Sequence, residues 1–314
     1  MRLIFTKKLG FCSGVRRAIS LAQSIPTRDN RKRAVATPVY TLGPLIHNPQ
    51  EVERLERLGV KPISRLDQIK TGTLIIPSHG LPQSILKKME KMQLKLIDAT
   101  CPFVKRAQLL TKSLHEKGYH VVIVGQKSHP EVISLLSFAN GEASAVETPG
   151  DVEKIKTSKK IGIIAQTTQS VESFEKIVKR LKIKIKKTKI HNTICKETSQ
   201  RQMEAKGLAE KADVMIVIGG KNSANTTRLY NICKKTTPSY HIETPEELKS
   251  NWFSRRRIVG ITSGTSTPDW IIKSVVKKLC NPFIPGRGMC HSLAGLDLLP
   301  KRGEKQAAMH KIEL

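Results

Sequence analysis

The strongest constraint on the fold of this 314-residue chain is a repeated alternation of short β-branched runs with amphipathic stretches. Residues 120–124 (HVVIV), for example, form a short and continuous apolar run, as strands of a parallel sheet do when both faces are covered. Residues 104–117 place apolar side chains at helical spacing instead. This order of strand, loop and helix predicts an α/β fold with parallel sheets.

The predicted strands are Leu3–Thr6, Val39–Leu42, Thr73–Ser78, Leu94–Ile97, His120–Val124, Lys160–Ala165, Val214–Ile218 and Ile258–Thr262. The predicted helices include Val15–Ser24, Val104–Lys117, Val171–Leu181, Thr198–Lys211 and Thr227–Lys235.

Three cysteines divide the chain into segments of similar length. Cys12, Cys101 and Cys195 each lie in a predicted turn before a helix, and a further step of similar length from Cys195 ends near Pro282. This spacing predicts three similar lobes, each bringing one thiol to a common centre. The predicted lobes are residues 14–100, residues 101–194, and residues 195–281 together with 1–13, followed by a tail at 282–314 of uncertain order.

The setting of the cysteines favours metal binding over disulfides. The N-terminus has no signal-peptide pattern, so we expect a cytoplasmic protein whose thiols stay reduced. No two cysteines have the C-x-x-C spacing, and a lone cysteine is more often a small buried residue than a ligand. All three cysteines lie at predicted helix N-termini, where the helix dipole favours the thiolate. This repeated placement makes it less plausible that each is merely a small buried residue. The remaining cysteines, Cys233, Cys280 and Cys290, are predicted to be structural or incidental.

The formal net charge of +29 raises the question of nucleic acid binding. The basic residues are spread along the chain, however, and the densest stretch, 176–189, has no aromatic residues for base stacking. We therefore expect a solvated basic surface, which could steer small anions or an acidic redox partner to the protein. No apolar stretch approaches the roughly 20 residues of a membrane span, so no membrane association is expected.

Polar side chains recur at the ends of predicted strands, where α/β proteins bind ligands. His47, His79 and His129 offer donors for an anion, and Glu131 offers a carboxyl group that could move a proton. Taken singly, each histidine is more often an ordinary hydrogen-bonded residue than a functional one.

Three polar turns, at 166–170, 219–226 and 263–269, also follow predicted strands. Such turns present N–H groups and hydroxyls to phosphate, although Ser, Thr and Asn are also ordinary helix caps. None matches the Walker A or dinucleotide-binding pattern, so a nucleotide is not specifically indicated.

Residues 1 to about 275 resemble the 4-hydroxy-3-methylbut-2-enyl diphosphate reductase family, the last enzymes of the non-mevalonate isoprenoid pathway. The motifs that carry the resemblance, in order, are GFCSGVRRAI, GPLIHN, SHG, DATCPFV, HPEV, AQTTQS, NTIC followed by RQ, GGKNSANTTRL and GITSGTSTPDW. Nine ordered motifs are hard to obtain by chance.

The resemblance implies three α/β lobes with small parallel sheets, arranged as a pseudo-threefold trefoil around one [4Fe–4S] cluster per chain. It implies that Cys12, Cys101 and Cys195 bind three irons, and that the fourth iron stays open for the C4 hydroxyl of the substrate. The implied reaction is reductive dehydroxylation of the allylic diphosphate to isopentenyl and dimethylallyl diphosphate.

The resemblance also implies roles for residues in the strand-end loops. Those expected to bind the diphosphate or line its pocket are His47, His79, His129, Ser223, Ala224, Asn225 and Ser266. Thr167 and Thr168 are expected to orient the hydroxyl and Glu131, and Glu131 is expected to supply the proton that turns the hydroxyl into water. The implied electron donor is ferredoxin or flavodoxin, and the oligomeric state, monomer or dimer, stays open.

The chain departs from the family pattern at three positions. Ala224 replaces a serine, Ser134 stands where glycine is common, and Lys196 follows a cluster cysteine directly. Two other functions remain as alternatives. Three thiolates with an open position could hold Zn²⁺ for hydrolysis, and the basic surface could serve a nucleic-acid-binding protein.

Overall fold

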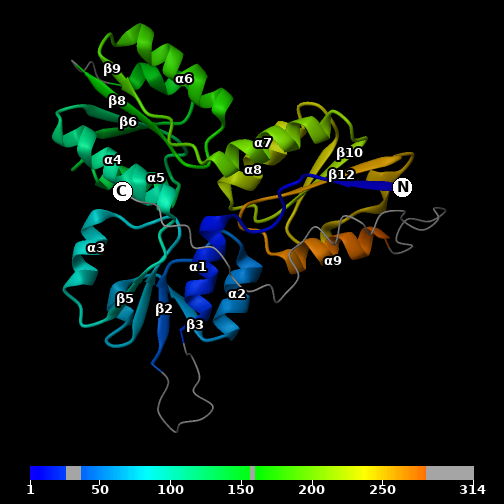
Figure 1. Ribbon diagram of the computed structural model, residues 1–314, viewed down its shortest axis with the longest axis horizontal. Helices are drawn as coiled ribbons and strands as arrows, with labels where there is room; N and C mark the ends of the chain where they lie inside the picture. Colours follow the sequence, from blue (N-terminus) through cyan, green and yellow to red (C-terminus); the bar gives the residue numbers. More distant parts are fainter. Residues whose placement is uncertain (26–36, 156–159, 281–314) are drawn as a thin grey trace.

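The computed structural model describes residues 1–25, 37–155 and 160–280. In these ranges the chain forms three four-stranded sheets whose strand pairs are all parallel. Figure 1 shows one sheet in each of three lobes that meet at a common centre. The predicted α/β class with three small parallel sheets is confirmed.

The first sheet has the order β3 (Val60–Ile63), β2 (Val39–Leu42), β4 (Thr73–Ile76) and β5 (Lys95–Asp98). The second has the order β7 (Ala143–Val146), β6 (His120–Val124), β8 (Ile161–Ala165) and β9 (Thr188–Ile190). The third has the order β11 (Ser239–Ile242), β10 (Val214–Ile218), β12 (Ile258–Ser263) and β1 (Arg2–Phe5).

The helices around the first sheet are α1 (Ser13–Gln23), α2 (Pro49–Arg57) and α3 (Gln83–Glu90). Those around the second are α4 (Pro102–Glu116), α5 (Pro130–Ser137) and α6 (Val171–Lys184). Those around the third are α7 (Lys196–Ala209), α8 (Ala224–Cys233) and α9 (Asp269–Cys280). Short 3₁₀ turns lie at Leu66–Gln68, Pro149–Lys154, Pro245–Glu247 and Ser250–Phe253.

The three lobes share one topology. The first two lobes run helix, strand, helix, strand, 3₁₀ turn, strand, helix and strand; the third has two 3₁₀ turns at the same place and ends with its third helix. In all three sheets the strands take the order second, first, third, fourth. In the third sheet the fourth place is taken by β1 from the N-terminus, which pairs with β12. The exact lobe boundaries given above remain a prediction, and residues 282–314, with Cys290, lie outside the described part.

Both faces of each sheet are covered, as the second lobe illustrates. Because successive strand residues point to opposite faces, Val121 and Ile123 of β6 pack with α4 and α5, whereas Val122 and Val124 pack with α6. All four valine and isoleucine side chains are fully buried, and burial of each stabilises the fold by about 1.5–3 kcal/mol. This double coverage explains why the central strands have continuous apolar sequences instead of alternating ones.

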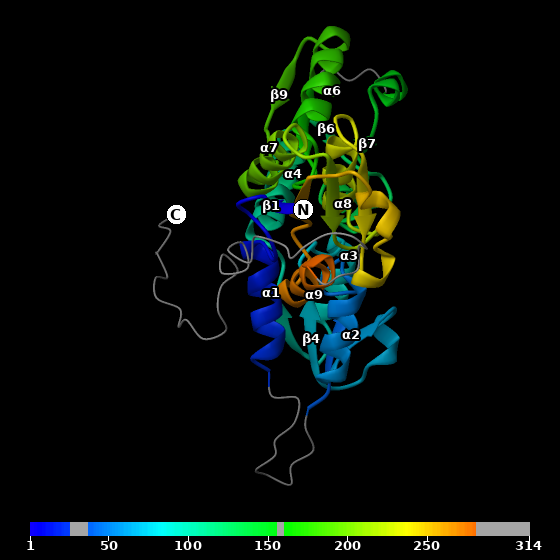
Figure 2. The ribbon, with the colours of Figure 1, turned by 90° about the vertical axis from the view of Figure 1, so that its right-hand side faces the viewer.

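The arrangement brings helix N-termini to the middle of the molecule from two sides. In Figure 2, α1 and α7 lie towards one side of the molecule, and α2 and α8 lie towards the other. Loops at the carboxyl ends of the parallel strands lead into these helices, so their residues meet at the centre. Among the described residues, the helices are all too short or too polar to span a bilayer.

Candidate active site

Three cysteines begin three helices at the centre of the trefoil. Cys12, Cys101 and Cys195 are the N-cap residues of α1, α4 and α7. The backbone N–H of each donates to a carbonyl oxygen in a strand-end loop: Cys12 to Thr265 (3.0 Å), Cys101 to Ser78 (2.9 Å) and Cys195 to Thr167 (2.9 Å). This repeated contact fixes each helix start, and therefore each sulfur, against the loop that follows a central strand.

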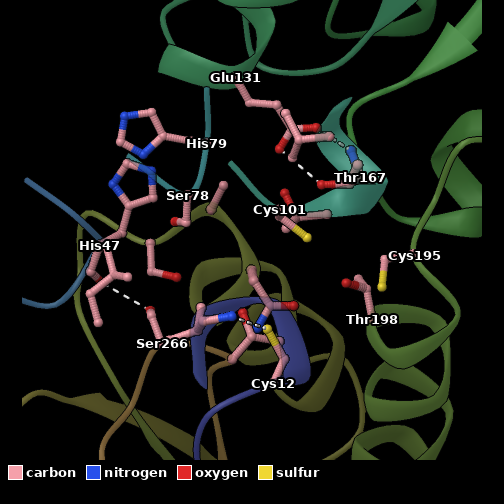
Figure 3. A pocket seen from close by; sticks show the side chains of 18 of the residues that line it. Cys12, His47, Ser78, His79, Cys101, Glu131, Thr167, Cys195, Thr198 and Ser266 are labelled. Carbon is pink, nitrogen blue, oxygen red and sulfur yellow. Dashed lines mark hydrogen bonds between the residues drawn. The ribbon is translucent and has the colours of Figure 1, made fainter. Parts of the chain in front are cut away.

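The three sulfur atoms face the same cavity (Figure 3). A Cβ atom on Gly14 would lie 2.6 Å from the Cys101 sulfur and 4.0 Å from the Cys12 sulfur, so only glycine leaves room for these thiols here. Burial raises the pKa of the Cys12 thiol to about 11, and it also raises the pKa of Cys101. Both thiols would therefore need a nearby cation, such as a metal, to become thiolates at neutral pH.

A second set of helices begins at the same cavity with a different kind of N-cap. The capping side chains accept from backbone N–H groups in the first turn: Asn48 from Glu51 (2.9 Å), His129 from Glu131 (3.1 Å) and Ser223 from Thr226 (3.3 Å). These caps start α2, α5 and α8 and place His47, Glu131 and Asn225 beside the cavity.

Three histidines form a cluster in one wall of the cavity. The His47 ring stacks on His79, and it meets His129 edge-on; both pairs have ring centroids 4.8 Å apart. Burial lowers the pKa of all three, and the other two rings lower the pKa of His79 further. The pKa of His129 falls to about 3 because of burial, His47 and Arg228. In the absence of an anion, the cluster is therefore neutral.

Several polar atoms beside the cavity have no hydrogen-bond partner among the described residues. They are Nε2 of His47, Nδ1 of His79, and both Nδ2 and Oδ1 of Asn225. Ser266 is anchored nearby, since its hydroxyl donates to the His47 carbonyl (3.0 Å). Buried polar groups normally have partners, and leaving one unsatisfied costs about 1–3 kcal/mol. An anionic ligand that accepts from the two rings and from Nδ2 of Asn225 would satisfy three of these four atoms, whereas Oδ1 of Asn225 would need a donor.

Glu131 is the buried carboxyl group of the site, with 2% of its surface exposed. Its two oxygens accept from the Thr167 backbone N–H (2.6 Å) and the Thr167 hydroxyl (2.9 Å). Burial raises its pKa to about 7, against the lowering effect of the Thr167 hydrogen bonds and the charge of Arg228. Glu131 is thus poised to hold or release a proton near neutral pH.

Every site residue predicted from the sequence lines this one cavity: Cys12, His47, His79, Cys101, His129, Glu131, Thr167, Thr168, Cys195, Ser223, Ala224, Asn225 and Ser266. The fold brings all thirteen residues to the same cavity. Cys233 lies elsewhere, fully buried in α8, and Cys280 ends α9.

The cavity is also lined by five polar or aromatic residues that were not predicted from the sequence: Ser78, Phe103, Glu197, Thr198 and Thr265. Ser78 and Thr265 follow buried strands within motifs already noted. Their place at a strand end could therefore have identified them as site residues. Glu197 and Thr198 lie in the first turn of α7, next to Cys195. Nothing in the local sequence distinguishes them from ordinary first-turn residues.

The departures from the family pattern have clear structural settings. Ser134 is fully buried in α5, where its hydroxyl donates to the Leu81 carbonyl and accepts from Gln108, both at 2.8 Å. Ala224 is the first residue of α8 and lines the cavity without offering a hydroxyl. Lys196 is exposed at the start of α7. Ser134 is therefore fully hydrogen-bonded in the fold.

The thiols do not form a compact site for a single ion. In residues 1–25, 37–155 and 160–280, no three His, Cys, Asp or Glu side chains are grouped so that they could hold one metal ion. The cysteines instead approach the cavity from three lobes.

Comparison with known proteins assigns the family. The family model described as LytB protein matches residues 3–280. A curated relative from Aquifex aeolicus is 48% identical over 286 residues, covering 88% of this chain and 96% of the relative. One from Geobacter sulfurreducens is 44% identical over 280 residues, covering 89% of this chain and 97% of the relative. Both relatives are named 4-hydroxy-3-methylbut-2-enyl diphosphate reductase.

Two solved structures have similar folds. A structure of (E)-4-hydroxy-3-methyl-but-2-enyl diphosphate reductase has 47% identity and a TM-score of 0.64, and the match covers 89% of this chain and 99% of that one. The E-1-hydroxy-2-methyl-but-2-enyl-4-diphosphate reductase from Plasmodium falciparum has 28% identity and a TM-score of 0.83, with 90% and 88% covered. The chain belongs to the LytB protein family, in which its curated relatives are 4-hydroxy-3-methylbut-2-enyl diphosphate reductases.

Proposed function

We propose that this chain reduces (E)-4-hydroxy-3-methylbut-2-enyl diphosphate to isopentenyl diphosphate and dimethylallyl diphosphate. The observation that carries the proposal is the division of one cavity into a wall of three thiols and a wall of polar groups that includes Glu131. A redox cofactor, an anion site and a proton source are the three things that reductive removal of a hydroxyl group from an allylic diphosphate requires. The names of the curated relatives support the same reaction.

The resident cofactor in this proposal is one [4Fe–4S] cluster per chain, held by Cys12, Cys101 and Cys195. The three thiols line one cavity and each begins a helix of a different lobe, so each thiolate would bind its own iron of a shared cluster. The zinc alternative would instead require the ligands to lie about 2.0–2.3 Å from a single ion. When bound, such a cluster would supply electrons singly and an open iron for the substrate hydroxyl.

The polar wall would hold the diphosphate. His47, His79 and Asn225 present the unpartnered atoms described above, and Ser223 adds a hydroxyl whose oxygen only accepts among the described residues. The Ser266 hydroxyl would bind the diphosphate in exchange for its bond to the His47 carbonyl. The diphosphate charge would raise the pKa of the neutral histidines and favour their protonated, doubly donating form. Charge-assisted hydrogen bonds of this kind contribute about 1.5–3 kcal/mol each. His129 and Ala224 would line the same wall, and no hydrogen bond to the diphosphate is assigned to them.

Glu131 would deliver the proton that converts the departing hydroxyl into water, and Thr167 and Thr168 would orient it. Overall, the C4–O bond breaks, two electrons and two protons are consumed, and an allylic C–H bond forms with loss of water. The raised pKa of Glu131, about 7, supports this role because a protonated carboxyl is then available near neutral pH. Protonation at either end of the allylic anion gives the two products.

We propose ferredoxin or flavodoxin as the electron donor, in the cytoplasm. Exposed basic residues lie close to two of the thiols: Arg16 one turn after Cys12, and Arg106 soon after Cys101. Helix α1 has no acidic residue, and the acidic residue of α4 is Glu116 at its far end. A basic face beside the thiols would attract an acidic carrier and make its KM rise with ionic strength.

The test is an anaerobic assay with the purified protein. Oxidation of reduced methyl viologen should depend on added 4-hydroxy-3-methylbut-2-enyl diphosphate, and both five-carbon diphosphates should accumulate. Substrate-independent oxidation, or no oxidation by protein that contains a full complement of iron, would contradict the proposed reaction.

A further inference from the structure

Arg228 is a largely buried cation next to the active site that the proposed mechanism does not use. It lies in α8, one turn beyond Ser223 and Asn225, and burial lowers its pKa to about 10. Among the described residues no carboxylate oxygen lies within 4.0 Å of its guanidinium, and the charges that raise its pKa are those of Glu131 and Glu147. Because burying a charge is costly, a cation held among neutral partners calls for a specific role.

The guanidinium group forms hydrogen bonds to one short loop of another lobe. Its Nε donates to Oε1 of Gln169 (2.9 Å), Nη1 to the Thr168 hydroxyl (3.4 Å) and Nη2 to Oε1 of Gln166 (3.2 Å). These three residues belong to loop 166–169 between β8 and α6, whereas Arg228 belongs to the third lobe. The planar fork of arginine suits this contact, since it offers several donors in fixed directions at once.

The fourth residue of the loop, Thr167, holds the carboxyl of Glu131. Both its N–H and its hydroxyl donate to that carboxyl, and its carbonyl accepts from Cys195. Arg228 therefore binds three side chains of a loop whose remaining side chain fixes the proton donor. The same helix α8 carries Ser223 and Asn225 at its start.

We propose that Arg228 is a positioning residue that sets loop 166–169, and through Thr167 the Glu131 carboxyl, at a fixed distance from the diphosphate-binding end of α8. Arg228 itself does not line the cavity. The inference rests on the proposed function, because it assigns Arg228 a part in proton delivery. It predicts that losing the guanidinium slows turnover while leaving the diphosphate contacts in place.

The kinetic test uses Arg228→Ala with chemical rescue. The kcat should fall by about 10- to 100-fold because small misplacements of reacting groups have effects of this size, while KM stays within about threefold. Ethylguanidinium should restore at least part of the lost turnover, whereas ethylammonium, which has the charge but not the fork, should not. Near-normal kcat in Arg228→Ala, or a rise in KM with no rescue, would overturn the proposal.

Arg57→Ala is the control. Arg57 lies in α2, the counterpart of α8 in the first lobe, and forms a 3.6 Å ion pair with Glu53; both side chains are exposed and lie away from loop 166–169. Its loss should leave kcat within about twofold, with no response to ethylguanidinium, as expected for exposed pairs. Rescue of Arg57→Ala to a similar degree would show that the guanidinium effect is not specific and would overturn the assignment.

A second readout needs no substrate and separates this inference from the proposed function. In Arg228→Ala, amide hydrogen exchange at Thr167 and Gln169 should speed up, because these N–H groups bond to Glu131 and Gln166 across the loosened loop. Exchange at Ile216, in the central strand β10, should not change. Unchanged exchange in the loop contradicts the inference, whereas an inactive wild-type enzyme with faster loop exchange in the variant contradicts the proposed reaction alone.

Discussion

Two sets of helix N-termini meet at the cavity, and they differ in how their first turns are capped. Helices α2, α5 and α8 begin with Asn48, His129 and Ser223, whose side chains satisfy a backbone N–H of the same helix. Helices α1, α4 and α7 begin with cysteine, and of these only Cys12 accepts a capping bond, at 3.4 Å to sulfur.

The difference shows what each set is built to bind. An oxygen cap is worth about 1 kcal/mol to a helix, so the cysteine set gives up stability to keep three thiols available. In the capped set, a side chain of the helix itself satisfies one N–H of the first turn, and other groups, such as the Asn225 amide, are left free for a ligand. One set therefore suits a metal cofactor that satisfies the thiols, and the other suits an anion.

The largest expected effect comes from breaking the cysteine set. Cys101→Ser should lose iron and keep less than about 1% of the activity, because a serine hydroxyl does not replace a thiolate on iron. Iron content and viologen oxidation measure this. Cys233→Ser is the control, since Cys233 is fully buried in α8 away from the cavity and should retain both. Equal damage at position 233 would refute the three-ligand arrangement.

Glu131→Gln tests the polar set without touching the thiols. The amide preserves the size of the side chain and can still accept from Thr167, but it cannot supply the proton. Turnover should fall by about 10²- to 10⁴-fold, the range expected for loss of a general acid. Iron content and KM should stay near the wild-type values. Near-normal turnover would remove Glu131 from the proton path.

The pH dependence follows from the same carboxyl group. Burial raises the Glu131 pKa from 4.5 to about 7, and the protonated form is the one that delivers the proton. Activity should therefore be highest below this pKa and fall about tenfold for each pH unit above it. Measuring kcat between pH 6 and 9 tests this decrease in activity. The residual activity of Glu131→Gln should not show the decrease. A wild-type rate that stays level across this range would contradict the assignment.

The smallest expected effect comes from adding a hydroxyl to the polar set. Ala224→Ser would place a donor at the first residue of α8, where the motif resemblance leads us to expect serine. One neutral hydrogen bond is worth about 0.5–1.5 kcal/mol, so KM should fall by roughly 2- to 10-fold with kcat unchanged. Ala212→Ser, equally buried but outside the cavity, should leave KM unchanged. An equal fall in KM at both positions would exclude a specific contact.

The sequence predicts the central strands of this fold better than its edges. The inner strands β2, β4, β6, β8, β10 and β12 all match predicted segments. The unpredicted strands β3, β7, β9 and β11 are all sheet edges. Edge strands are covered less completely and need no continuous apolar run: β7 reads ASAV, and β3 contains Pro62. The apolar signal is therefore weakest where burial is weakest.

The same contrast holds for the site. Motif position was enough to select residues that line the cavity, because loops after parallel strands meet at one edge. Arg228 stands in one of these motifs, yet its function in holding loop 166–169 depends on a contact between lobes. Such a contact leaves no periodicity or local pattern in either segment. Only the packing of the third lobe against the second reveals it.

The most direct test of the whole account is the iron and sulfide content of anaerobically purified protein, measured together with its electronic spectrum. The account predicts about four irons and four sulfides per chain, a brown protein, and loss of both when Cys12, Cys101 or Cys195 is replaced by serine. A colourless protein that takes up one zinc and no iron after reconstitution would contradict it.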